Sequence, residues 1–319
     1  MPALKKRLPS SSSAARREGL IIAAFGRHYE VLAQGERLQC YPRGKKSVYA
    51  CGDEVDITPG GDAQGVIEQL RPRRSLLWRS DAFRQKLIAA NLSHACIVVA
   101  TEPGFSPQLI SRCIAAAEHE GIRPLIILNK ADLLAGLDHA RALLAPFAAL
   151  GYDILELSAL EGGTDIDQLA NLLADKQAIF VGQSGMGKST LINALLPEAR
   201  AQTGEISTAL DSGRHTTTFA RLYPLGAAAG SQADGWIIDS PGLQVFGLAH
   251  LSAEQLAHSF IEFRPLLGDC RFRDCRHEAE PGCALLAALA AGDIDSGRFE
   301  HFRSIRAEIA NARQLNPGW

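Results

Sequence analysis

The sequence is poor in aromatic residues and has no long hydrophobic run. Aromatics make up 6% of its 319 residues, although the full hydrophobic share reaches 46%. No apolar stretch approaches the roughly 20 residues that a membrane-spanning helix requires. The basic start of the chain runs into Ser10–Ser13 without an apolar segment of signal-peptide type. We therefore expect a cytoplasmic protein of two or three domains that contacts no membrane.

Cysteine is also scarce, with seven residues in the whole chain. Three of them fall between positions 270 and 283, and the other four have no regular spacing. In a reducing compartment, scattered thiols are usually small buried hydrophobes, which is how we interpret these four. They are Cys40, Cys51, Cys96 and Cys113.

The net charge of −2 hides an asymmetry along the chain. Residues 1–86 contain 16 basic and 9 acidic residues, a net charge of +7, whereas the remainder carries 17 basic and 26 acidic residues, a net charge of −9. A basic front end favours an anionic partner such as a nucleic acid. The alternative is a basic surface that only faces solvent, and charge alone leaves both open.

The front of the chain alternates short strands with turn residues. Residues 1–18 are basic and serine-rich with little to bury, so we expect them to be disordered. Five short strands within 19–78 predict a small barrel of the oligonucleotide-binding (OB) type. Arg43, Lys45 and Lys46 lie in one expected loop of this barrel. The expected strands are Leu20–Phe25, Tyr29–Ala33, Arg37–Tyr41, Glu54–Thr58 and Gly65–Gln69.

The central part, assigned here to 79–247, alternates apolar strands with helices such as Ser106–Glu120. Continuous apolar strands with helices between them predict an α/β fold with a mostly parallel sheet covered on both faces. Such sheets bind ligands at the carboxyl ends of their strands, and each motif described below follows an expected strand. These strands are Ala95–Thr101, Pro124–Leu128, Ile154–Leu157, Ala178–Val181 and Trp236–Ile238.

A phosphate-binding loop follows the fourth of these strands. The segment has the pattern of glycine, four residues, then Gly-Lys-Ser, and an expected helix starts at Thr190. Its glycines let the backbone N–H groups turn toward phosphate oxygens, Lys188 supplies a positive charge, and the Ser189 hydroxyl is a candidate Mg²⁺ ligand. The loop residues are Gly182, Gln183, Ser184, Gly185, Met186, Gly187, Lys188 and Ser189.

The tetrapeptide Asn129-Lys130-Ala131-Asp132 selects guanine over adenine. The Asp132 carboxylate can accept hydrogen bonds from guanine N1–H and the exocyclic amine, whereas adenine would leave it unpaired at a cost of about 1–3 kcal/mol. We expect Asn129 to tie this loop to the phosphate loop, the Lys130 stem to cover the base, and Ser158-Ala159 to support the base through backbone contacts. This tetrapeptide precedes the phosphate loop, the reverse of the usual order, so we interpret the GTPase core as circularly permuted.

A third motif, Asp239-Ser240-Pro241-Gly242, follows the last expected strand. Asp239 can hold a Mg²⁺-bound water, and the Gly242 N–H can sense the γ-phosphate. Position 243 is Leu, which cannot orient the attacking water as a glutamine does.

A candidate switch segment lies between the glycine loop and this motif. One of Thr216 and Thr217 is expected to complete the Mg²⁺ shell, and His215 is the candidate for positioning the water, with an ordinary surface histidine as the alternative.

The last part of the chain, 248–319, is predicted to be helical around a metal site. Cys270, Cys275, His277 and Cys283 offer three thiolates and one imidazole within 14 residues, the ligand set of a closed, structural zinc site. Phe299, Phe302, Ile305 and Ile309 repeat at helical spacing, and we expect this stripe to face the core.

Together these residues resemble one family, the ribosome small-subunit-dependent GTPase A family (RsgA, also called YjeQ). The resemblance extends from about residue 20 to nearly the end and includes Arg43-Gly44-Lys45, the motif order 129, 158, 182, 239 and the zinc-type cluster. It implies an OB barrel, a permuted GTPase domain with Mg²⁺ and GTP, and a C-terminal zinc domain.

The resemblance further implies binding to 16S rRNA near the decoding region, a role in late assembly of the 30S subunit, and hydrolysis of GTP to GDP stimulated by that particle. It implies that His215 assists hydrolysis. It also implies that a hydrophobic residue at position 243 is usual for the family. We expect a monomer. The Ser-rich front tail departs from the family, and Met186 in the glycine loop is a variation without chemical consequence.

Two other functions are weighed against a GTP-switched ribosome assembly factor. A metabolic or signalling NTPase would show rapid turnover indifferent to ribosomal subunits, but the sequence has no second catalytic constellation. A passive RNA-binding module would keep its activity without Lys188. Because the permuted order places Gly242 directly before the zinc region, we also predict that the γ-phosphate state is transmitted from Gly242 to that region.

Overall fold

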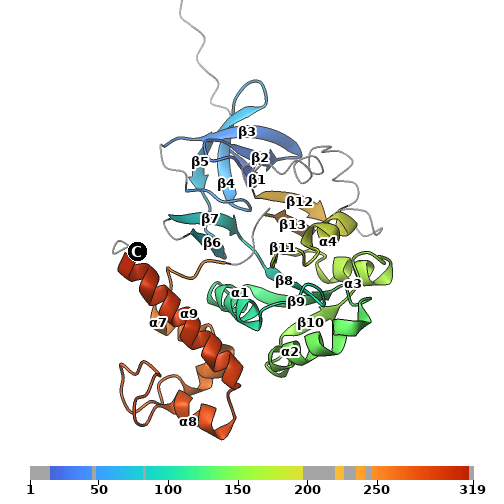
Figure 1. Ribbon diagram of the computed structural model, residues 1–319. Coiled ribbons are helices and arrows are strands. Elements are labelled where there is room, and N and C mark those ends of the chain that lie inside the picture. The colour runs from blue at the N-terminus through green and yellow to red at the C-terminus, as the bar shows by residue number, and fades with distance from the viewer. Residues whose placement is uncertain are drawn as a thin grey trace, which may run out of the picture.

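The computed structural model describes residues 15–44, 48–81, 84–196, 220–225, 235–240 and 246–315. Figure 1 shows three parts in chain order: a small barrel (blue), an α/β region (green to yellow) and a set of C-terminal helices (orange to red). This confirms the predicted combination of a barrel, an α/β GTPase-like region and a helical C-terminal region. No helix among the described residues is long and apolar enough to span a membrane.

Five strands form the barrel, in the order β1-β2-β3-β5-β4, and pairing between β1 and β4 closes it. Alternation places every second side chain inside, as in β2, where Tyr29, Val31 and Ala33 are buried and their neighbours are not. All neighbours pair antiparallel except β3 and β5. The strands are β1 (Arg17–Ala24), β2 (Tyr29–Ala33), β3 (Glu36–Pro42), β4 (Glu54–Pro59) and β5 (Gln64–Leu70).

Two details of the front region differ from the expectation. Strand β1 starts at Arg17, inside the segment expected to be disordered, because Arg17 pairs with Ile57 of β4 and its guanidinium binds Glu36. A hairpin of β6 (Leu76–Asp81) and β7 (Arg84–Ala90) was not predicted, and the boundary placed at 78/79 falls inside it. The polar residues Arg79–Asp81 of β6 and Arg84–Lys86 of β7 interrupt the apolar alternation that would have predicted the hairpin.

The α/β region contains five parallel strands and one antiparallel strand, in the order β10-β9-β8-β11-β13-β12. The five expected strands are confirmed to within two residues, but β12 was missed. The strands are β8 (His94–Ala100), β9 (Arg123–Asn129), β10 (Asp153–Glu156), β11 (Gln177–Val181), β12 (Arg221–Leu225) and β13 (Gly235–Asp239). The helices are α1 (Pro107–His119), η1 (Leu134–Gly136), α2 (Leu137–Ala149), α3 (Thr164–Leu172) and α4 (Lys188–Leu195).

The barrel and the α/β region share one continuous sheet. Ala23 of β1 pairs with Arg221 of β12, so all eleven strands of the two regions are connected by backbone hydrogen bonds. Arg221 also forms an ion pair with Glu30 at 3.0 Å. The antiparallel strand β12, which joins the two regions, lies shortly after the segment expected to be the nucleotide switch.

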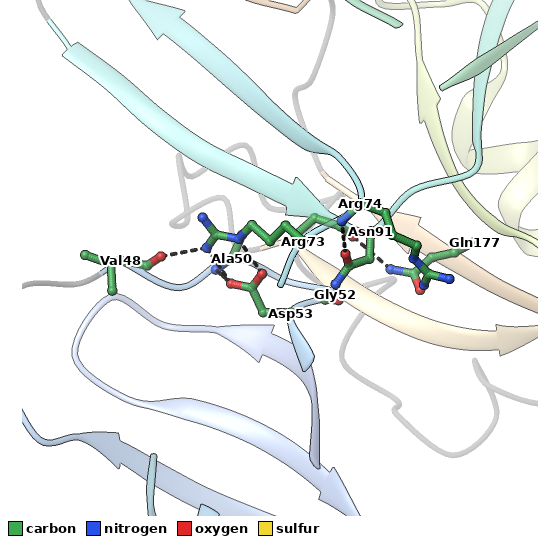
Figure 2. A network of polar contacts seen from close by, with 9 residues as sticks. Val48, Ala50, Gly52, Asp53, Arg73, Arg74, Asn91 and Gln177 are labelled. Atoms are coloured by element: carbon green, nitrogen blue, oxygen red, sulfur yellow. Dashed lines mark hydrogen bonds and ion pairs between the residues drawn. The ribbon is translucent and has the colours of Figure 1, made fainter. Parts of the chain in front are cut away.

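A polar network reinforces this junction (Figure 2). The fully buried Asp53 carboxylate accepts hydrogen bonds from the Ala50 N–H and from the Arg73 guanidinium, each at 2.7 Å. Asn91 donates to the Gly52 carbonyl and accepts from the Arg74 N–H, both at 2.9 Å. The polar groups between barrel and α/β region are therefore hydrogen-bonded to one another.

The C-terminal region packs an aromatic cluster against the long final helix. Phe260, Phe263, Phe299 and Phe302 are all at most 1% exposed, with ring centroids 5.1–6.1 Å apart. The expected core-facing stripe is confirmed, and this helix lies against α1 of the α/β region. The helices are α7 (Ala253–His258), η2 (Ile261–Leu266), α8 (Ala284–Ala291) and α9 (Ser296–Leu315).

Candidate functional site

The predicted nucleotide motifs meet at one edge of the parallel sheet. The tetrapeptide starts at the end of β9, Ser158 follows β10, the glycine loop follows β11, and Asp239 ends β13. Because these four strands are parallel, their carboxyl ends share one edge, which is where such sheets bind ligands. The predicted nucleotide-site residues that the structure describes are thus brought together at this edge.

The glycine loop requires glycine at two positions. Gly182 has φ = 154°, and a Cβ there would lie 2.2 Å from the Val98 carbonyl oxygen. Gly187 has φ = 89°, and a Cβ there would lie 2.2 Å from Asn129 Nδ2. Gly187 is the N-cap of α4, so the loop delivers Lys188 and Ser189 at a helix N-terminus, where backbone N–H groups and the helix dipole favour an anion.

Asn129 joins three loops of the site. Its side-chain amide donates to the Met186 carbonyl at 2.8 Å, and its amide oxygen accepts from the Ala159 N–H at 3.0 Å. Asn129 is 1% exposed, and the buried Met186 side chain holds the glycine loop against the core. The tie between the base-reading loop and the phosphate loop, expected from the sequence, has the geometry predicted for it.

Hydrogen bonds fix the loop of Lys130 and Ala131, which was expected to read the base. Thr101 donates its hydroxyl to the Lys130 carbonyl at 3.0 Å, and Lys130 Nζ donates to the Glu102 carbonyl at 2.7 Å. The Ala131 N–H donates to the Leu157 carbonyl at 3.1 Å, which anchors the loop to β10. Asp132 is exposed, so its carboxylate is available to a base. Thr101 and Glu102 were not identified from the sequence, since nothing in their local pattern distinguishes them.

Lys188 and Asp239 form the electrostatic centre of the site. Burial raises the pKa of Asp239 to about 6, and attraction to Lys188 opposes this shift. Burial lowers the pKa of Lys188, and Asp239 opposes that shift in turn. Lys188 Nζ donates to the carbonyls of Gly182 and Gln183. A half-buried ammonium and a half-buried carboxylate that influence each other at a helix N-terminus suit a phosphate with a divalent cation, since each charge then gains a partner.

Several predicted residues lie outside the described part of the chain. They are the switch-segment residues His215, Thr216 and Thr217, the γ-phosphate sensor Gly242 with its neighbour Leu243, and the loop lysines Lys45 and Lys46.

The four predicted zinc ligands come together in the C-terminal region. Their ligand atoms all lie within 4.8 Å of one another. Cys270 Sγ lies 3.9 Å from Cys283 Sγ, and His277 Nδ1 lies 3.6 Å and 3.3 Å from these two sulfurs. A tetrahedral zinc with ordinary bond lengths separates its ligands by about 3.6–3.8 Å, so the donor set and spacing of this Cys₃His cluster with Cys275 fit zinc.

The basic front end is largely paired within the protein. Arg43, the one described member of the expected RNA-binding loop, forms an ion pair with Glu68 at 2.7 Å and remains exposed. Other arginines of the barrel and its junction have acidic partners too. These pairs are Arg17–Glu36, Arg37–Glu30, Arg71–Glu18, Arg71–Asp56, Arg73–Asp53 and Arg74–Glu54. Residues 15–44 and 48–81 contain nine arginines and nine acidic residues, so the described barrel and its junction carry no part of the net positive excess.

The chain is similar to proteins of one family throughout most of its length. The family model described as RsgA GTPase matches residues 70–249. A Bordetella pertussis protein named small ribosomal subunit biogenesis GTPase RsgA is 52% identical over 93% of this chain and 97% of its own. A Burkholderia pseudomallei protein of the same name is 54% identical over 90% of each chain.

Two solved structures share the architecture. The crystal structure of YjeQ from Thermotoga maritima superposes with a TM-score of 0.71 at 28% identity, covering 93% of this chain and 99% of that one. The structure of YloQ, described as a circularly permuted GTPase, gives a TM-score of 0.67 at 28% identity, covering 95% and 98%. The similarity thus extends over the barrel, the α/β region and the C-terminal region together.

Proposed function

The chain belongs to the RsgA GTPase family and is a GTPase, and from this premise we propose that it hydrolyses GTP during biogenesis of the small ribosomal subunit. In this proposal it binds the 30S particle and its 16S rRNA late in assembly, near the decoding region, and the particle stimulates hydrolysis. The bacterial relatives named for small-subunit biogenesis, at 52–54% identity, support the process. Because the free positive charge of the barrel is limited, we propose that rRNA contacts concentrate in the loop of Arg43, Lys45 and Lys46.

The observation that carries the nucleotide proposal is the double hydrogen bond of Asn129, which fixes the base-reading loop to the glycine loop and to Ala159. A guanine base held by Asp132 would then leave its phosphates at the N-terminus of α4. Backbone N–H groups of the loop and Lys188 would bind the β- and γ-phosphates. GTP binding is therefore proposed for the whole set named from the sequence, with Ser158 and Ala159 closing the base pocket.

Metal and water have separate roles in this proposal. Mg²⁺ would be held by Ser189, by Asp239 through a water, and by Thr216 or Thr217. His215 would position the attacking water, since Leu243 has no polar group to do so. When bound, Mg²⁺ would neutralise charge that develops on the phosphates. The Cys₃His cluster would hold one structural zinc.

The base assignment can be tested with an Asp132→Asn variant. An amide at this position donates where a carboxylate accepts, so we expect GTP affinity to fall by at least about a hundredfold and xanthosine triphosphate affinity to rise. Calorimetric titration with both nucleotides measures this. Asp138→Asn is the matched control, because Asp138 lies on α2 with a fully exposed carboxylate. Equal loss of both nucleotides in Asp132→Asn would argue against the base-reading role.

The ribosomal assignment can be tested by turnover assays with and without purified 30S subunits. We expect slow intrinsic hydrolysis and strong stimulation by the subunit, abolished in Lys188→Ala. GTP turnover that 30S subunits leave unchanged, in protein that binds GTP normally, would contradict the proposal and favour a metabolic NTPase. Assembly activity retained in full by Lys188→Ala would instead favour a passive RNA-binding module.

A further inference from the structure

A second cluster of metal-ligand side chains lies apart from the Cys₃His cluster. His119 is the last residue of α1, Glu120 follows it as the C-cap, and His250 lies between β13 and α7. One ligand atom from each of the three lies within 4.8 Å of the other two. These residues are 130 positions apart in sequence, and only the packing of the C-terminal region on α1 brings them together.

The surroundings orient these side chains as metal ligands are oriented. One carboxylate oxygen of Glu120 accepts the Leu76 N–H at 2.9 Å, which leaves the other oxygen on the side of His119, 3.9 Å from its Nε2. The His250 ring contacts the rings of Trp78 and His119, with centroids 6.0 Å and 5.8 Å away. A hydrogen bond from outside the cluster to a ligating carboxylate is a common feature of metal sites.

His250 is the least satisfied member of the cluster. Both of its ring nitrogens are buried, and neither has a hydrogen-bond partner among the described residues. A neutral imidazole with a buried, unpaired nitrogen lone pair is the form that coordinates a metal ion. A metal bond would satisfy a polar group whose burial otherwise costs about 1–3 kcal/mol.

We propose that His119, Glu120 and His250 form a second metal site that takes a divalent transition-metal ion such as Zn²⁺. Two imidazoles and one carboxylate are a zinc ligand set that leaves a fourth position open, unlike the closed Cys₃His set. Ligands on such an ion are separated by about 3.3 Å, so small side-chain rotations would bring these atoms into place.

Solvent access and position suit such a site. A cavity of about 380 Å³ opens beside His119, the one cluster residue that lines it, and gives an ion a solvent approach past Glu254 and past Glu118, which is paired with Arg264. An ion there would link the C-terminal end of α1 to the segment that leads from β13 into α7. The site would therefore fasten the C-terminal region to the α/β region at the connection between them.

The test is metal stoichiometry in the full-length protein. With the Cys₃His cluster loaded, wild-type protein is titrated with Zn²⁺ and with Co²⁺ and followed by calorimetry and by visible absorption. We expect one further equivalent, with a Co²⁺ spectrum of nitrogen and oxygen ligation that lacks thiolate charge transfer. His119→Gln and His250→Gln should each bind this equivalent at least about tenfold more weakly.

The matched control is His258→Gln, which alters a histidine of the same cavity that lies outside the cluster. It should keep the second equivalent. Circular dichroism and GTP affinity of each variant establish that it is folded. A folded wild-type protein that binds only one zinc would overturn the proposal, as would an undiminished second equivalent in the His250→Gln variant. GTP turnover is measured separately, so failure here leaves the proposed function intact.

Discussion

The α/β region meets the barrel through paired strands and a closed polar network, whereas it meets the C-terminal region through helix packing and isolated side-chain pairs. At the barrel junction, β1 and β12 join the two parts into one sheet, and Asp53, Arg73 and Asn91 satisfy one another or nearby backbone (Figure 2). At the C-terminal junction, α9 lies across α1 without any shared backbone ladder among the described residues.

The polar atoms of the C-terminal junction are incompletely paired. His250, Arg298 and Arg313 each have a buried side-chain nitrogen without a hydrogen-bond partner among the described residues. Arg298 is 1% exposed and spans the boundary, since its guanidinium binds Glu262 at 2.8 Å and lies 5.4 Å from the ring centroid of Phe147 on α2. Each unpaired buried group costs about 1–3 kcal/mol, so this junction has more to gain from rearrangement or from a ligand than the barrel junction has.

This difference favours the C-terminal junction as the one that responds to nucleotide. The chain leaves β13 at Asp239 and reaches α7 through buried residues, including Phe246, Leu248 and Leu251. The Gly247 N–H in this connection donates to the Trp78 carbonyl at 3.0 Å. The described part of this connection, from Phe246 onward, is packed rather than free, which is what the predicted coupling from Gly242 would need.

The largest effect is expected when the Cys₃His cluster is removed. This change should affect the C-terminal junction and leave the barrel junction intact. We expect Cys275→Ser to unfold the segment around 268–292, because a structural zinc site contributes about 10–16 kcal/mol in small zinc-binding peptides. The barrel junction should stay protected in hydrogen exchange, since no residue of it contacts the cluster. Asp274→Asn, an exposed neighbour, is the control. Loss of protection throughout the barrel would show that the two junctions are not independent.

A smaller loss of stability is expected when the shared acceptor of the barrel-junction network is removed. Asp53→Ala leaves the Arg73 guanidinium and the Ala50 N–H without their shared acceptor, and we expect the free energy of unfolding to fall by about 3 kcal/mol. Urea denaturation measures it. Arg74→Ala, which removes an exposed pair with Glu54, should change stability by less than about 1 kcal/mol. Similar losses of unfolding free energy in both variants would mean that the network stabilises the protein no more than a surface ion pair does.

Acid should loosen the C-terminal junction through His301. Its Nδ1 lies 2.8 Å from the Ser111 hydroxyl across the α1–α9 contact. Burial chiefly lowers the pKa of His301, with Arg298 adding and Asp295 opposing. The unfolded chain therefore binds the proton at the ordinary pKa of 6.5 and the folded chain only at lower pH, so stability is full above 6.5 and falls as the pH drops below it.

Hydrogen exchange of α9 measured between about pH 7.5 and about pH 5.5 tests this acid response. His301→Gln cannot take up a proton and should reduce the pH dependence of exchange in α9. The hydrogen bonds of Asp53, Arg73 and Asn91 at the barrel junction involve no histidine, so exchange there is the internal reference. An unchanged pH profile in His301→Gln would assign the response to another group.

The smallest effect is expected at the periphery of the same helix contact. Arg112→Ala removes the ion pair with Glu308, whose side chain is 60% exposed, and should lower stability by less than about 1 kcal/mol. Arg303→Ala, which removes an exposed pair within α9, is the control. A loss of several kcal/mol in Arg112→Ala, measured by thermal unfolding, would show that polar pairs hold the C-terminal junction as firmly as the barrel network holds the other.

Local patterns in the sequence determined the nucleotide motifs, their permuted order, the predicted zinc ligands and the approximate positions of most described strands. Tyr29–Ala33 is identical in prediction and structure, because alternation and turn residues act over a few positions. The tie from Asn129 was also predictable, because parallel strands bring their carboxyl ends to one edge.

Tertiary structure alone decided the pairing of β12 with β1, the pairing of the basic front end with its own acidic residues, and the meeting of His119 with His250. Arg73 illustrates the reason. The sequence around it indicates an unpaired positive charge, but in the folded chain its guanidinium lies 2.7 Å from the Asp53 carboxylate. Periodicity and propensity describe contacts a few residues apart, whereas these contacts depend on how separate elements pack, which no local pattern encodes.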